Sequence, residues 1–138
     1  MTQELTAAEM HRLAEGCYEF AKALRIYRDD HWDELTDQER GDLKRLHHML
    51  IDTSRSLVTD AVIQSLIAIG PSVAVLNECA AGLKQAAENI ANVKKAIELA
   101  TTAITLVASI SVAAATGNVS ALIGTAAGVL TLAEEVTR

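Results

Sequence analysis

Apolar residues in the first third of the chain recur at helical spacing. They lie three or four positions apart and so fall on one face of a helix: Leu13, Cys17, Phe20, Ala21, Leu24 and Tyr27. Thr6 and Glu9 stand three residues apart, the spacing of a capping box, which predicts that this helix starts at Thr6. Residues 29–33 are polar and break the pattern, and they predict a link to the next helix.

A second helix is predicted to start at the capping box of Thr36 and Glu39. Its apolar stripe continues to about residue 69: Leu43, Leu46, Leu50, Leu57, Val58, Ala61, Val62 and Leu66. The apolar turn Ile69, Gly70 and Pro71 ends it, since glycine suits a left-handed closing position and proline the first turn of a new helix. Residues 61–77 carry no charge. An uncharged turn is expected to be covered by another element or inserted into something.

A third stripe runs on without an evident stop from residue 71 to Gly117-Asn118. Its members again share one helical face: Val73, Leu76, Ala80, Leu83, Ala87, Ile90, Val93, Ile97 and Ala100. An unbroken helix of about 45 residues would span roughly 68 Å. Because that length is rare in a compact domain, we expect a bend at Thr101-Thr102. A fourth helix is predicted from Val119 or Ser120 to Glu135.

These patterns predict an all-α fold, an elongated helical hairpin or bundle of about four helices in a single domain spanning residues 1–138. Composition agrees, because half of the residues are hydrophobic but only 3% are aromatic, and one proline and seven glycines leave few tight turns. The charge is uneven. Residues 1–60 hold 13 acidic and 8 basic side chains and form polar amphipathic helices, whereas the apolar helices of residues 61–138 hold 5 and 4.

The strongest single feature is an uncharged stretch, residues 99–133, which divides at Gly117-Asn118 into a helical hairpin. Each arm is shorter than the roughly 20 residues that span a bilayer core. Small residues recur every fourth position along each arm, which lets helices approach closely in lipid or in a soluble bundle. They are the predicted membrane or oligomer interface: Thr101, Thr105, Ser109, Ala113, Gly117, Ser120, Gly124 and Gly128.

The uncharged length, the Gly117-Asn118 tip and the small-residue lines over residues 61–133 resemble α-helical pore-forming toxins of the cytolysin A and tripartite haemolysin type. Those toxins carry an apolar hairpin that is hidden in the soluble form. The resemblance implies a soluble monomer that assembles and inserts residues 99–133, with helices 6–28 and 37–69 remaining outside.

The net charge of −6 argues against a nucleic-acid partner and gives no polybasic attraction to anionic lipid. No nucleotide-binding glycine loop, nucleophile elbow or zinc spacing is present, so we expect no enzyme, no cofactor and no metal. His11 with Glu15 reads as a surface pair and residues 29–33 as a solvated link. Cys17 and Cys79 are expected to be buried reduced thiols, with a disulfide as the alternative.

The predicted function is therefore a self-assembling, membrane-interacting helical protein that inserts its uncharged hairpin, pore formation included. The alternative is a soluble homo-oligomeric scaffold, or a small helical chaperone or regulator of a helical partner, that uses the same helices as its interface. The N-terminal segment has neither a basic start nor an apolar run, so we expect cytoplasmic synthesis without a signal peptide. Membrane association, or export by a signal-less route, would be compatible with that.

Overall fold

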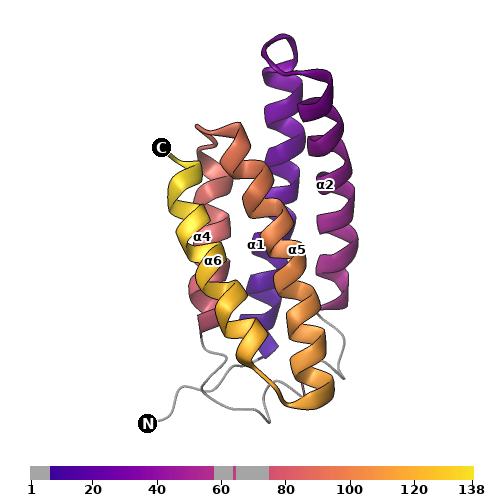
Figure 1. The fold of residues 1–138 in the computed structure, drawn as a ribbon, viewed down its shortest axis with the longest axis vertical. Coiled ribbons are helices and arrows are strands. Elements are labelled where there is room, and N and C mark those ends of the chain that lie inside the picture. The colour runs from indigo at the N-terminus through magenta and orange to yellow at the C-terminus, as the bar shows by residue number, and fades with distance from the viewer. Residues whose placement is uncertain (1–6, 58–63, 65–74) are drawn as a thin grey trace.

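The computed structural model describes residues 7–57, 64 and 75–138, and within them the protein is an all-α bundle of five helices without strands (Figure 1). A short 3₁₀ helix, η1, joins the first two. In chain order the elements are α1 (Ala7–Asp30), η1 (Trp32–Glu34), α2 (Asp37–Ser56), α4 (Val75–Glu88), α5 (Val93–Thr116) and α6 (Ser120–Val136). The predicted fold class is confirmed.

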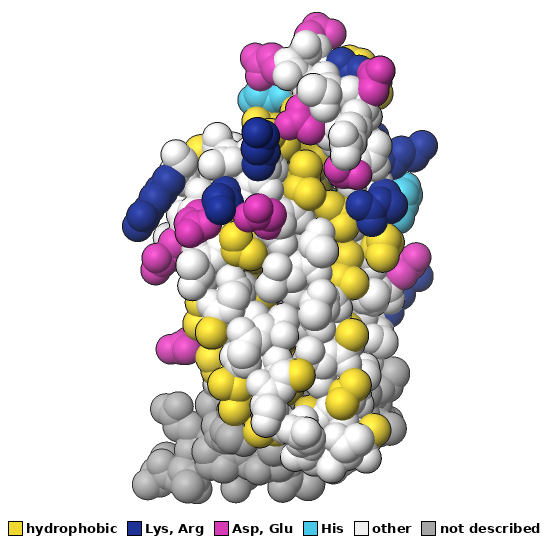
Figure 2. Space-filling model, viewed as in Figure 1, with side chains coloured by type: hydrophobic (Ala, Val, Ile, Leu, Met, Phe, Trp, Pro, Cys, Tyr) yellow, Lys and Arg dark blue, Asp and Glu magenta, His cyan; other side chains and the backbone are white. Residues whose placement is uncertain are grey.

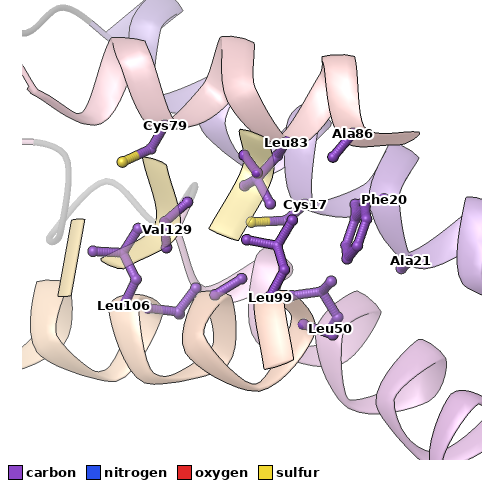
Figure 3. Close-up of a cluster of buried hydrophobic side chains, with 14 of the residues drawn as sticks. Cys17, Phe20, Ala21, Leu50, Cys79, Leu83, Ala86, Leu99, Leu106 and Val129 are labelled. Atoms are coloured by element: carbon purple, nitrogen blue, oxygen red, sulfur yellow. The ribbon is translucent and has the colours of Figure 1, made fainter. Parts of the chain in front are cut away.

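The five helices form a closed ring around one core (Figure 1). Going round the ring, α1 packs on α2, α2 on α5, α5 on α6, α6 on α4, and α4 back on α1. The largest side chains that are fully buried come from three of the helices and the residue that ends α2, and most are leucines: Leu13, Phe20, Leu24, Leu43, Leu46, Leu50, Leu57, Leu76 and Leu83. Figure 3 shows how leucines from α2, α4 and α5 converge near Phe20. Almost all of the core is aliphatic, as the composition predicts.

Two of the predicted helix ends are present as expected. The Thr36–Glu39 capping box is complete: the Glu39 amide donates to Thr36 Oγ1 at 3.1 Å, and the Thr36 amide donates to Glu39 Oε1 at 2.9 Å. Gly117 ends α5 in the left-handed conformation, with φ 77°, and its amide donates to the Ala113 carbonyl at 2.7 Å. The predicted cap at Thr6 and the apolar turn Ile69, Gly70 and Pro71 lie outside the described residues.

The expected bend at Thr101-Thr102 is wrong, because these residues lie inside α5 and the helix breaks at residues 89–92 instead. Contacts distant in sequence hold the break, since the amides of Ala91 and Asn92 both donate to the Val136 carbonyl, at 2.9 and 3.1 Å. The chain thereby reverses and lays α5 beside α2. The link predicted at residues 29–33 lies later in the chain, at residues 31–36, because α1 runs to Asp30 and α2 begins only at Asp37, with η1 between them. The second helix, predicted to run to about residue 69, is also shorter, because α2 ends at Ser56 with Leu57 as its C-cap.

Candidate interaction surface

The outward side of α5 and α6 is an exposed surface without charge. We call it the uncharged face and define it by ten exposed residues: Thr101, Thr105, Ala108, Ser111, Val112, Ser120, Ile123, Gly124, Ala127 and Thr131. Figure 2 views the molecule from this side, where charged side chains gather towards the upper end and along the margins. Exposed helix surfaces normally mix charges of both signs, so an uncharged one favours burial against a partner.

Five hydroxyl groups on the outward side of α5 and α6 need no water, because they bond to their own helices. Each donates to the carbonyl four residues earlier: Thr101 to Ile97 (3.0 Å), Thr105 to Thr101 (3.1 Å), Ser111 to Val107 (3.3 Å), Thr125 to Ala121 (2.7 Å) and Thr131 to Ala127 (3.2 Å). A polar group is costly to bury only when its hydrogen bond is lost. These side chains can therefore be covered without leaving unsatisfied donors.

The small-residue line predicted along α5 does not stay on one side of the helix. Thr101, Thr105 and Gly117 are exposed, whereas Ser109 and Ala113 are buried in the core. Four residues advance 400° around a helix, so a line of every fourth residue winds by about 40° per step. The structure thus divides the predicted α5 residues between the uncharged face and the core.

Along α6 the predicted residues differ in their surroundings. Ser120 and Gly124 are exposed, and a Cβ built on Gly124 would meet nothing within 4 Å. Gly128 is half-buried, and its Cβ would lie 3.5 Å from Thr102 Cγ2 of α5. Gly128 therefore serves the contact between α5 and α6 within the molecule, while Gly124 is open to a partner.

Two further glycines, which the sequence reading did not single out, allow close helix contacts. A Cβ on Gly16 of α1 would lie 2.9 Å from the backbone oxygen of Ala80 in α4. A Cβ on Gly82 of α4 would lie 3.3 Å from Ala133 Cβ in α6. The available signal was their position inside apolar helical stripes, because glycine weakens a helix and usually has a packing reason there.

Val112 and Ile123 apart, which are exposed on the uncharged face, the largest apolar side chains of the hairpin point the other way, into the bundle. Leu99, Leu106 and Val129 lie in the buried cluster of Figure 3. Among the described helices, α5 is the one long and apolar enough to cross a membrane, and 44% of its apolar 18-residue stretch is buried inside the protein. A core helix passes the same length and composition test, so α5 qualifies for either environment.

Both cysteines are free and buried. Burial, with a smaller contribution from Cys79, raises the pKa of Cys17 to about 12. Burial, with a smaller contribution from Glu78, raises the pKa of Cys79 to about 12. The Cys79 thiol donates to the Ala126 carbonyl of α6 at 3.5 Å. Buried thiols with raised pKa values are weak nucleophiles, so both cysteines have a structural role in the core.

Across the part of the chain that is described, no group of three or more His, Cys, Asp or Glu side chains is arranged to hold a metal ion. His47 Nδ1 lies 2.6 Å from the Ala21 carbonyl, which makes it a contact between α2 and α1. A cleft of about 370 Å³ lies between the C-terminal parts of α1 and α4, and Tyr27 and His31 stack at its edge with ring centroids 4.0 Å apart.

Comparison of this chain with protein-family models, with curated proteins and with solved structures found no match. The resemblance of residues 61–133 to α-helical pore-forming toxins consequently stays a prediction. What the chain does is inferred below from its own surfaces.

Proposed function

We propose that this protein is a self-assembling helical module and that the uncharged face of α5 and α6 binds another copy of the chain. The observation that carries the proposal is the combination found on this face: it is exposed, it has no charged side chain, and its hydroxyls at positions 101, 105, 111 and 131 bond within their own helices. Water is therefore displaced from it at little cost.

The chemistry of the face suits a like partner. Small side chains let two helix backbones approach closely, and Gly124 offers the deepest point of approach because nothing of the monomer lies above it. A face without charge offers no electrostatic complement to a charged target. It can pair with itself through a two-fold axis, which is the commonest way in which identical subunits associate.

Insertion of the assembled α5–α6 hairpin into a membrane is the second candidate. It is favoured by α5, whose uncharged residues 99–116 would extend about 27 Å along a helix, close to the roughly 30 Å of a bilayer core. Insertion requires the buried leucines of α5 and α6 to leave the bundle and face lipid. The threonines and serines of the uncharged face would then contact neighbouring copies.

Light scattering over a concentration series, paired with dye release from phosphatidylcholine vesicles, tests both candidates. A concentration-dependent rise from monomer to a defined oligomer, without dye release, supports self-assembly alone. Dye release with protein recovered in the vesicle fraction supports insertion of the hairpin. A monomer at every concentration that leaves vesicles intact contradicts both functions.

A further inference from the structure

The link at residues 89–92 breaks a helix that the local sequence favours. Asn89-Ile90-Ala91-Asn92 contains neither glycine nor proline, and Ile90 continues the apolar stripe of α4 into α5. Besides the Asn92 cap on α5, contacts from elsewhere hold the break, because the amides of Ala91 and Asn92 donate to the Val136 carbonyl at the end of α6. The continuous apolar stripe and the tertiary structure therefore disagree at this link, and such a disagreement marks a place where a second conformation is close in energy.

If α4 continued past its present end, it would have space beside α1. Figure 1 shows α1 extending beyond the end of α4, and the cleft of about 370 Å³ occupies the angle between them. Ala23, Ile26 and Tyr27 of α1 line it at helical spacing, opposite Ala87 and Ile90. Ile26 is 46% exposed there. Extending α4 past Glu88 would carry it along this part of α1 and cover Ile26.

The α5–α6 hairpin is attached to the rest of the bundle mainly by apolar packing. The described ion pairs of the hairpin stay within it, since Lys95 Nζ bonds Glu98 at 3.3 Å and Glu135 at 3.0 Å. Towards α1, α2 and α4 the hairpin presents buried leucines, valines and alanines. The same apolar contact can therefore form between the hairpin of one copy and the helices of another.

From these observations we propose that α4 and α5 can join into one continuous helix, residues 75–116, and that the α5–α6 hairpin then packs on a second copy of the chain. In the exchanged dimer each hairpin packs on the partner's α1, α2 and α4 through the contacts it makes within the monomer. Exchange of identical elements is a low-cost route to a dimer, because no new interface has to be built. The extended helix fills the cleft beside α1. This inference rests on the proposed self-assembly only in requiring that two copies meet, and it uses a different surface.

An engineered disulfide distinguishes exchange from association of intact monomers. The Cβ built on Gly82 lies 3.3 Å from Ala133 Cβ, close to the range of about 3.5–4.5 Å that a disulfide needs. In a monomer, the double variant G82C/A133C links α4 to α6 of the same chain. In an exchanged dimer, the same two cysteines link two chains. The parent protein is the control, because its own thiols are buried.

The double variant is first oxidised when dilute, where an intramolecular link should form and increase its mobility on a non-reducing gel. It is then concentrated while reduced, mixed with a copy of different tag length, and oxidised. A covalent dimer containing both tags is the expected result. A dimer seen by light scattering whose links are all intramolecular overturns exchange and leaves pairing through the uncharged face. A monomer in all conditions overturns both.

A second variant tests the helix junction without engineered cysteines. The Asn92 side chain caps α5 by accepting from the Lys95 amide at 3.2 Å. N92A removes that cap in both chains of the exchanged dimer and favours the continuous helix, so the exchange equilibrium should shift roughly fivefold per chain, the equivalent of one lost cap. N92D keeps a capping carboxylate and should leave the equilibrium unchanged. Equal dimer fractions for N92A, N92D and the parent would refute the proposed joining of α4 and α5 into one helix.

Discussion

Gly124→Leu tests the uncharged face most directly, because the structure separates its effect on the monomer from its effect on assembly. A Cβ at Gly124 meets nothing within 4 Å, so a leucine there projects into solvent without displacing any neighbour. Leucine also favours a helix over glycine by up to about 1 kcal/mol. The monomer should therefore gain stability, with a rise in Tm of about 4 °C for a chain of this size.

Assembly should respond in the opposite direction. If another copy lies on this face, the leucine side chain separates two backbones that glycine allows to approach. Overfilling a packed contact costs roughly 1–3 kcal/mol, which raises the dissociation constant by about fivefold to 150-fold. Sedimentation equilibrium, run beside thermal unfolding of the same samples, measures both quantities.

Gly41→Leu is the matched control for this experiment. Gly41 lies inside α2, is exposed, and also has nothing within 4 Å of its Cβ. The same substitution there should raise Tm equally and leave association unchanged. Unaltered association of Gly124→Leu, or equal weakening in both variants, would refute the assignment of the uncharged face as the contact.

Three further predictions follow from burial. Ser109→Lys places a charge at a position only 8% exposed and should lower the free energy of unfolding by roughly 3 kcal/mol in urea titration. It should also abolish any membrane activity. Ser111 is exposed on the uncharged face, so Ser111→Lys should leave stability unchanged and weaken association. Gly16→Ala would put a Cβ 2.9 Å from a backbone oxygen of α4 and should lower Tm, at a cost of roughly 1–3 kcal/mol, whereas Gly41→Ala should raise it, as calorimetry would show. The two native thiols, with pKa values of about 12 in the fold against an ordinary value near 8.5, hold few thiolates at pH 8 and should react with dithionitrobenzoate about a thousandfold more slowly in buffer than in urea; rapid reaction in buffer would contradict their burial.

The sequence predicted the elements whose cause is local. The Thr36–Glu39 box specifies the start of α2 by its own side chains, and Gly117 specifies the end of α5 because a left-handed residue without a Cβ is favoured there. The spacing of apolar residues three or four positions apart predicted which face of α1, α2 and α4 is buried. The sequence also identified residues 99–133 as an uncharged stretch that divides at Gly117-Asn118 into two helical arms.

The break between α4 and α5 was not predictable in this way. No residue of the link forbids a helix. Asn92 caps α5 locally, but the carbonyl that binds the amides of Ala91 and Asn92 belongs to Val136, more than forty residues further along the chain. The close contacts of Gly16 and Gly82 were likewise invisible, because a glycine in an apolar stripe does not reveal which helix approaches it. Nor could a small-residue line show that Ser109 and Ala113 turn inward while Gly124 stays open.

Sequence by itself determined that this protein is helical, where α2 begins, where α5 ends and where α6 lies, and that its C-terminal hairpin avoids charge, since each of these follows from spacing, capping and composition within a few turns of chain. Tertiary structure alone decided that five helices close into a ring and which side of the hairpin is left exposed. Those outcomes depend on how helices distant in sequence pack around one core, and no short stretch of sequence encodes that packing.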